Sequence, residues 1–424
     1  MRVVMISDQE THGGAAVAAS RLATALIARN HEVIRIVPEH DGRTHPWTTI
    51  ELRLTILLRI VRRMTSRAMW RKLGERVALT RLQRILNRLQ PETINIHNLH
   101  GVPGEDWSPE FAAVCAKTAP TVWTLHDMWS FTGRCTYNRG CRRFEHGCGR
   151  DCPTPDEYPS LDPRQIVGAW RRRRRLLQRN PRTVAVTPSR WLAREAVAGP
   201  WPSRSVETIP YGLPLEVFAE VDRTTARKAL AVDAPGPVLV AVAVDWRDPR
   251  KGAHILGGAL ARLQEKTTVI TLGSKEIGGW DRWATANVHE LGFIDHERTR
   301  ALAYSAADLL VHPALEDNLP NVVLESIACG TPVVGLPIGG VPEMVRPGRT
   351  GWLTEDASRE SLSHTIDCAL RDIAGGVNLR RSCREVAEVE YGADLQAQRY
   401  ETLFHRMVGR SPREGSVTNT ENQL

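Results

Sequence analysis

The stretch LLVHPALEDNLPNVVLES, residues 309–326, holds the features that decide the fold. Its apolar start, residues 309–311, leads into a polar loop with Glu316 and Asp317, and a helix is predicted to begin near Pro320. A proline suits the first helical turn because no backbone donor is needed there. In open parallel sheets, ligands bind beyond the carboxyl ends of the strands. The stretch therefore predicts an α/β fold with a ligand site at this loop.

The same strand-loop-helix order occurs on both sides of a break near residue 200. Residues 2–7 form an apolar strand, Gly13 and Gly14 follow in a polar loop, and a helix leads to a strand at 32–37. This βαβ order indicates a parallel sheet, and it restarts with a continuous apolar run at 238–244. A chain of 424 residues is also longer than one core usually supports. We therefore expect domains at 1–200 and 206–390.

The charge of the chain favours an anionic partner. The net charge is +8, and eleven basic residues stand against one acid between Arg53 and Arg88, within a segment 51–90 that is predicted to be helical. A basic helix with interleaved apolar residues is typical of binding to an anionic membrane surface, and a solvated helix face is the alternative. No nucleic-acid motif accompanies the charge, so nucleic acid is not expected as a partner.

The ends of the chain give expectations about location. The first strand is too short for the apolar core of a secretion signal, and no stretch approaches the ~20 apolar residues of a membrane span. We expect a cytoplasmic protein, held at the inner face of the cell membrane if the basic segment binds lipid. The polar tail 409–424 is predicted to be disordered.

Four cysteines cluster in an insert at 129–159 that is too long for an ordinary connection. They are spaced C-x5-C-x6-C-x3-C, which differs from a standard zinc ribbon. In a reducing compartment such a cluster favours a structural zinc ion over disulfides, and unligated thiols remain the third alternative. The candidate ligands are Cys135, Cys141, Cys148 and Cys152.

The acids of the opening stretch carry a family resemblance. Asp317 and Glu325 stand eight positions apart, and the region resembles the E-x7-E region of the retaining glycosyltransferases of family 4, which have the GT-B fold of two Rossmann-like domains facing each other across a cleft. The resemblance implies that Asp317 contacts the donor sugar and that Glu325 holds the ribose. This sequence departs from the family pattern in two ways. The first acid is Asp317 instead of Glu, although Glu316 stands next to it, and the loop that follows lacks the Gly-Phe-Gly of the family. Residues 328–335, 339–343 and 348–351 resemble the same family.

A second motif implies how the diphosphate is held. Asp248-Pro249-Arg250-Lys251-Gly252 resembles the family motif that follows a strand and ends in Lys-Gly. A cation there would stabilise negative charge on the leaving group, a role that the resemblance gives to Lys251 with Arg247 or Arg250 as helper. The implied donor site comprises Arg247, Arg250, Lys251, Glu316, Asp317, Asn318, Leu319, Pro320, Asn321 and Glu325.

The first half of the chain resembles the acceptor side of these enzymes. Gly13 and Gly14 resemble the acceptor-side glycine loop, and His126 follows an apolar strand at 121–125. In the family, the matching histidine contacts the donor sugar near the reacting centre, so His126, Asp317 and Lys251 are the implied catalytic residues. His97 and His100 fit a subset that resembles the colanic-acid-type exopolysaccharide transferases, as groups that line the cleft.

The resemblance implies transfer of a hexosyl group from a nucleoside diphosphate sugar to a hydroxyl of a growing, lipid-linked glycan. It also implies retention of configuration, catalysis without a metal or other cofactor, and a helix at 391–408 that returns to the first domain. The alternatives are a GT-B-fold epimerase or phosphorylase, a basic nucleic-acid-binding protein, and an inactive scaffold that still binds sugar nucleotide.

Overall fold

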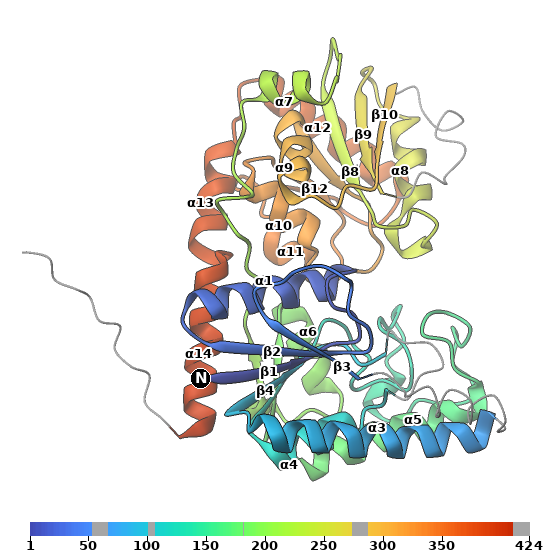
Figure 1. The fold of residues 1–424 in the computed structure, drawn as a ribbon. Coiled ribbons are helices and arrows are strands. Elements are labelled where there is room, and N and C mark those ends of the chain that lie inside the picture. Colours follow the sequence, from blue (N-terminus) through green and yellow to red (C-terminus); the bar gives the residue numbers. More distant parts are fainter. Residues whose placement is uncertain (53–66, 101–106, 181, 274–286, 410–424) are drawn as a thin grey trace, which may run out of the picture.

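The computed structural model describes residues 1–52, 67–100, 107–180, 182–273 and 287–409, which form two α/β domains stacked one above the other (Figure 1). The predicted architecture of two Rossmann-like domains is confirmed, because each domain is built on its own parallel sheet. Part of the predicted basic helix, at 53–66, and the tail 410–424 lie outside the described residues.

The first domain contains a seven-stranded parallel sheet in the order β3-β2-β1-β4-β5-β6-β7. Its inner strands are buried, as expected for a parallel sheet that helices cover on both faces, although β4 and β5 also bury threonines and Asn95. The strands are β1 (Arg2–Ile6), β2 (Glu32–Val37), β3 (Thr48–Glu51), β4 (Thr93–Ile96), β5 (Thr121–Thr124), β6 (Thr183–Thr187) and β7 (Val206–Thr208). The helices are α1 (Gly14–Ala28), α3 (Arg67–Leu89), α4 (Phe111–Thr118), α5 (Pro163–Arg179) and α6 (Arg190–Ala198), with 3-10 turns η1 (Arg143–Glu145) and η2 (Ser203–Ser205).

The second domain contains a six-stranded parallel sheet in the order β10-β9-β8-β11-β12-β13. The strands are β8 (Val238–Val242), β9 (Thr268–Leu272), β10 (Asn287–Gly292), β11 (Leu309–His312), β12 (Val333–Gly335) and β13 (Gly351–Leu353). The helices are α7 (Arg223–Ala229), α8 (Ala253–Leu260), α9 (Glu297–Ala306), α10 (Asn321–Ala328), α11 (Val341–Met344), α12 (Arg359–Ala374) and α13 (Arg380–Glu390), with the 3-10 turn η3 (Pro249–Lys251).

The last helix, α14 (Ala393–Val408), leaves the second domain and packs along the first (Figure 1). Its buried side chains Tyr400 and Phe404 share a core with Val3 and Met5 of β1, and Leu22 of α1 completes this face. The Tyr400 hydroxyl also lies 2.8 Å from the Thr124 hydroxyl of β5. The final helix therefore completes one face of the first sheet.

The second domain and the basic helical segment both begin later in the structure than the sequence predicts. The second domain was expected from residue 206, but β7 pairs with β6 as the edge strand of the first sheet, so the chain leaves that sheet only after Thr208. The helical segment was expected from residue 51, but Glu51 ends strand β3, which pairs with β2. Both missed strands are short edge strands, whose few residues carry little periodic signal.

Helix α3 supplies both core and surface. Ala78, Leu82 and Leu86 are buried in the core of the first domain, whereas Arg84 and Arg88 are exposed. Within the described residues, no helix combines the length and the apolar character needed to cross a membrane.

Candidate active site

The order of each sheet places loops at its centre where ligands can bind. In the second sheet, β8 and β11 are neighbours whose connections leave in opposite directions, which makes a topological switch point at their carboxyl ends. The loop after β8 carries Lys251 and the loop after β11 carries Asp317. Their side chains meet, with Lys251 Nζ 2.9 Å from Asp317 Oδ2. The two sequence motifs therefore join at one point.

The backbone around Lys251 is fixed by close packing. Asp248 caps the 3-10 turn η3 by accepting the Arg250 N–H at 3.0 Å. Gly252 follows with φ +70°, and a Cβ there would lie 1.9 Å from the Pro313 carbonyl oxygen. Only glycine fits this approach, so the loops after β8 and β11 are held against each other.

The Asp317 carboxylate is ionised despite its burial. Burial alone would raise the pKa of Asp317, but the charge of Lys251, the nearby His312 and hydrogen bonds from Lys251 and the Asn318 N–H leave it below its ordinary value. Gly339 packs against the backbone of Asp317, since its φ is +53° and a Cβ there would lie 1.8 Å from the Asp317 carbonyl oxygen. The pair therefore presents fixed opposite charges.

Helix α10 begins directly after this loop, with Pro320 as its N-cap. The Asn321 side chain donates to the Gly14 carbonyl at 3.0 Å, so the start of α10 faces the start of α1 across the gap between the domains. Exposed amides at helix starts suit phosphate groups. Leu319, by contrast, lies in the core of the second domain, so only its backbone can contact a donor.

Asn318 joins the two domains through its side-chain amide. Its Nδ2 donates to the His126 carbonyl at 3.1 Å, and its Oδ1 accepts the Ser189 hydroxyl at 2.5 Å. Glu343 forms a second contact between the domains, because its carboxylate accepts the backbone N–H of Arg190 at 2.9 Å. These contacts hold the loop after β11, residues 313–320 and called here the donor-side loop, against the carboxyl ends of the first sheet.

Glu325 lies one turn into α10 and is buried in a network of cations. Its carboxylate accepts Arg21 Nη2 at 2.6 Å, the Tyr304 hydroxyl at 2.9 Å and Arg300 Nη2 at 3.3 Å. Burial alone would raise the pKa of Glu325, but the charges of Arg21 and Arg300 lower it. A ribose hydroxyl that bonds to Glu325 must share or displace one of these donors.

The two arginines predicted to assist Lys251 differ in their exposure to solvent. Arg250 is half-buried, pairs with Asp248 at 2.6 Å and lies 5.6 Å from the centre of the Tyr137 ring, from the first domain. Arg247 pairs with Asp245 at 2.9 Å and its side chain is 60% exposed. Arg250 therefore belongs to the interdomain site, and Arg247 lies at the surface.

Glu316 points toward the first domain instead of sharing the pair with Lys251. It accepts the Arg139 backbone N–H at 2.9 Å. Burial raises the pKa of Glu316, although the Arg139 N–H and the charge of Arg139 oppose the shift. This acid anchors the cysteine-rich insert to the donor-side loop.

His126 follows β5 at the gap, and both of its ring nitrogens are occupied. Nδ1 lies 2.6 Å from the Tyr211 hydroxyl and Nε2 lies 2.9 Å from His97 Nδ1. Burial lowers the pKa of His126 to about 4, so the ring is neutral. The ring contacts His97 and Tyr211, and its backbone carbonyl holds Asn318.

His100 forms a separate charged pair on the first domain. Its Nε2 lies 2.8 Å from Asp127 Oδ2, and its Nδ1 lies 3.3 Å from the Tyr158 hydroxyl. Burial alone would lower the pKa of His100, but the charge and hydrogen bond of Asp127 raise it. Gly13 and Gly14 lie at the start of α1 instead, so the acceptor-side candidates fall into two places.

Two groups of residues have metal-ligand chemistry. The four clustered cysteines line one cavity in the insert and are all free thiols. Among the described residues, the group whose ligand atoms all lie within 4.8 Å is a different one, on the first domain, and it comprises Glu10, His40, Asp41 and His45. Glu10 already accepts Trp47 Nε1 at 3.1 Å and the Asp41 N–H at 3.0 Å.

Several residues at this gap were not found from the sequence. Arg21 is the clearest, because a charged residue on the alanine-rich helix α1 is a signal that could have been followed. The others lacked such a signal, since their role depends on how the domains face each other. They are Tyr137, Arg139, Ser189, Tyr211, Arg300, Tyr304 and Glu343.

Comparison with known proteins covers both domains. Residues 12–217 match the family described as Glycosyltransferase Family 4, and residues 236–372 match the family described as Glycosyl transferases group 1. The chain is 26% identical to the putative colanic acid biosynthesis glycosyl transferase WcaC of Escherichia coli K12 over 271 residues, 60% of each chain. It is 34% identical to the D-inositol 3-phosphate glycosyltransferase of Mycobacterium sp. strain KMS over 195 residues, 44% of this chain and 43% of the relative. The chain thus spans less than half the length of the latter relative.

Solved structures share the fold across nearly the whole chain. The Anabaena protein HepE in complex with UDP-glucose has a TM-score of 0.68 at 18% identity, covering 95% of this chain and 99% of that one. Sucrose-phosphate synthase of Thermosynechococcus elongatus has a TM-score of 0.70 at 19% identity, covering 96% and 99%. With two parallel-sheet domains and family matches in both halves, the chain belongs to the GT-B-fold glycosyltransferases of family 4.

Proposed function

We propose that this protein transfers a hexosyl group from a nucleoside diphosphate sugar to a hydroxyl of a lipid-linked glycan during exopolysaccharide synthesis, with retention of configuration. The observation that carries the proposal is the pair of Lys251 and Asp317, 2.9 Å apart at the switch point of the second sheet. The start of α1 faces this point through Gly14 and Asn321. One cation, one carboxylate and two helix starts thus surround a single gap.

Lys251 and Arg250 are proposed to hold the diphosphate. During transfer, the C1–O bond to the diphosphate breaks, a C1–O bond to the acceptor forms, and the acceptor hydroxyl passes its proton to an oxygen of the departing diphosphate. Negative charge therefore develops on the leaving diphosphate, where fixed cations and amides stabilise the transition state without reorganising. The oxocarbenium-like sugar would be favoured by the nearby carboxylate of Asp317. This chemistry requires no metal ion.

For His126 we propose a positioning role in addition to the sugar contact implied by the resemblance. Its ring is fixed between His97 and Tyr211, and its carbonyl holds Asn318 of the donor-side loop. The ring would reach a donor sugar only by releasing one of these two partners. The family identification and the UDP-glucose bound to HepE support a nucleotide-sugar donor, and the likeness to WcaC supports exopolysaccharide as the product.

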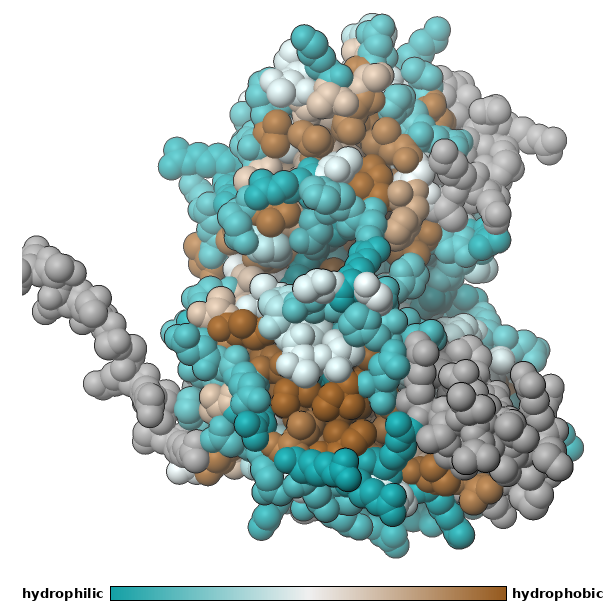
Figure 2. Space-filling view, viewed as in Figure 1, coloured by the Kyte–Doolittle hydropathy of each residue, from teal (hydrophilic) through white to brown (hydrophobic). Residues whose placement is uncertain are grey.

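The proposal places the enzyme at the inner face of the cell membrane. Exposed arginines occur on two helices of the first domain, Arg84 and Arg88 on α3 and Arg171 and Arg175 on α5. Hydrophilic side chains cover the lower edge of the molecule, where α3 and α4 run (Figure 2). Each Lys or Arg near an anionic surface contributes about 1 kcal/mol of attraction. Flotation with vesicles should therefore require anionic lipid, and equal, negligible binding to neutral and anionic vesicles would contradict this placement.

The test of the activity is transfer from a panel of isotope-labelled sugar nucleotides to a membrane extract that contains lipid-linked glycans. Label should appear in the lipid fraction with or without EDTA, and NMR of the product should show the anomeric configuration of the donor. A changed sugar epimer without transfer would indicate an epimerase, and sugar 1-phosphate formation from a glycan and phosphate would indicate a phosphorylase. Salt-dependent DNA binding with no transfer would indicate a nucleic-acid-binding protein.

A further inference from the structure

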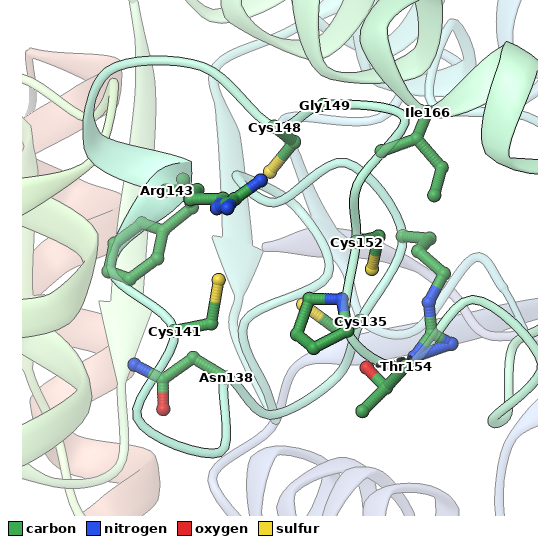
Figure 3. Close-up of a pocket in the computed structure, with 12 residues that line it drawn as sticks. Cys135, Asn138, Cys141, Arg143, Cys148, Gly149, Cys152, Thr154 and Ile166 are labelled. Atoms are coloured by element: carbon green, nitrogen blue, oxygen red, sulfur yellow. Dashed lines mark hydrogen bonds between the residues drawn. The ribbon is translucent and has the colours of Figure 1, made fainter.

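The insert between β5 and α5 brings four thiols into one place. Cys135, Cys141, Cys148 and Cys152 line a single small cavity, and their sulfur atoms point into the same space (Figure 3). All four are free thiols, and Cys148 Sγ accepts the Gly133 N–H at 3.2 Å. A backbone N–H that donates to sulfur favours the thiolate form, which is the form that binds a metal.

The walls of this cavity are rich in positive charge. Arg134 and Arg143 line it, although Arg143 is already paired with Asp151. The nearby guanidinium of Arg173 is buried under the Trp129 ring, 3.9 Å from the ring centre. Arg173 donates to the Thr132 carbonyl at 2.7 Å, but its Nε and that of Arg134 have no hydrogen-bond partner. No carboxylate in the described part of the chain forms an ion pair with Arg173.

A buried cation of this kind needs a compensating negative charge. Burial lowers the pKa of Arg173 to about 9, while the thiols of Cys135 and Cys148 and, more weakly, the carboxylate of Asp127 act in the opposite direction. Four neutral thiols give no such charge. One divalent cation bound to four thiolates would carry a net charge of −2, which matches this basic surrounding.

The loop between the first two cysteines reaches the site between the domains. Tyr137 contacts Arg250, with the guanidinium 5.6 Å from the ring centre, and the Arg139 N–H donates to Glu316 at 2.9 Å. Arg139 also pairs with Glu157 of the same insert at 2.8 Å. Residues 136–140 are thus the part of the insert that contacts the donor-side loop.

We propose that Cys135, Cys141, Cys148 and Cys152 bind one structural Zn²⁺ ion, and that this ion fixes residues 136–140 against the donor-side loop. A site with four thiolate ligands favours zinc. Zn²⁺ has a filled d shell that imposes no coordination geometry, and it takes four ligands in structural sites. Binding exchanges four thiol protons for one Zn²⁺, so four protons are released. The metal site itself does not depend on the proposed function, and only the meaning of the loop contact rests on it.

The four sulfur atoms are not packed as tightly as bound ligands in this structure. Their set is absent from the groups of described residues whose ligand atoms all lie within 4.8 Å. Thiolates bound to one zinc ion lie about 2.3 Å from it, so binding should draw the insert together. The loop 136–140 should therefore become more rigid when the ion binds.

The first test measures the metal in the full-length protein, purified under reducing conditions without added metal. We expect one zinc per chain by mass spectrometry, and the charge-transfer and ligand-field bands of a tetrahedral thiolate site after replacement by Co²⁺. Cys141→Ser and Cys148→Ser should each lower metal affinity at least tenfold, whereas Cys368→Ser on α12, outside the cluster, should retain the ion. A wild-type protein without these cobalt bands, or with disulfides among the four cysteines, would overturn the site.

The second test measures the loop by hydrogen exchange, which requires no donor and no activity. Removal of the ion with a chelator should speed exchange in the peptide that contains residues 136–140 at least tenfold, because Arg139 loses its fixed position. The strands β8 and β9 of the second domain serve as the internal control and should be unchanged. Equal exchange in the loop with and without the ion would overturn the proposed coupling even where the metal is present.

Discussion

The guanidinium of Arg21 on α1 lies 2.6 Å from the carboxylate of Glu325 on α10, and both side chains are almost completely buried. The pair joins the two domains directly behind the switch point. Arg21 also pairs with Glu297 at 2.7 Å. Loss of either partner should be costly, because a buried charge without its partner is unfavourable.

Arg21→Met should destabilise the protein strongly. Removal of one member of a buried ion pair costs about 3–5 kcal/mol, because the remaining charge stays buried. Chemical denaturation should show this loss, and Glu325→Gln in the same chain should restore part of it. Arg43→Met is the matched control, since the Arg43–Asp295 pair also joins the domains but is 61% and 57% exposed, and its loss should change stability far less than the loss of the buried pair. Equal effects of the two variants would contradict the assignment.

Lys251→Met should lower the transfer rate without unfolding the protein. The loss of one preorganised group that stabilises transition-state charge lowers kcat by about 10²–10³-fold. Steady-state kinetics with the donor that the sugar-nucleotide screen identifies would measure it. Lys228→Met on α7, an exposed lysine, should leave kcat unchanged. A normal kcat in Lys251→Met would remove this residue from the proposed chemistry.

Gly339→Ala should damage the donor-side loop, whereas Gly348→Ala should be mild. Both glycines have positive φ, +53° and +74°, but a Cβ at 339 meets the Asp317 carbonyl oxygen at 1.8 Å and a Cβ at 348 meets nothing within 4 Å. Backbone strain alone costs about 1–2 kcal/mol. Thermal melting should therefore show a small loss for Gly348→Ala and a larger one for Gly339→Ala, with donor binding lost only in the latter. Similar losses would show that the contact with Asp317 is unimportant.

Stability should fall as the pH drops from about 6.5 to 4. Burial lowers the pKa of His126 and of His312 to about 4, and an unfolded histidine titrates near 6.5. In this window the unfolded chain binds protons that the folded chain does not, so unfolding becomes easier at lower pH, by about 1.4 kcal/mol per pH unit for each such imidazole. Denaturation midpoints between pH 4 and 8 would measure the slope.

His312→Asn should reduce that slope, because one of the buried imidazoles is removed. His254→Gln is its control, since His254 is exposed on α8, and it should leave the slope as in the unchanged chain. A pH-independent midpoint between 4 and 6.5 in the unchanged chain would mean that these histidines are protonated in the folded protein.

Much of the fold follows from local sequence, and much of the site does not. The run Val238–Val242 predicts a buried strand because it is apolar on both faces, and the structure places it at the centre of the second sheet. Asp317 and Lys251 could be paired from motifs, since parallel neighbouring strands end at one edge. The partners of Arg21 and Asn318 could not, because they come from the other domain and depend on its orientation. The burial of the Leu319 side chain could not be predicted for a similar reason, since burial in a core is decided by tertiary packing.

The way α14 completes the first sheet has a consequence for synthesis on the ribosome. Tyr400 and Phe404 cover β1 and α1, so β1 and α1 wait, with this apolar face open, for a helix that is made only after the whole second domain. The second domain emerges in between and is free to fold earlier. This apolar face of the nascent first domain is thus exposed to chaperones and to aggregation until α14 has been made.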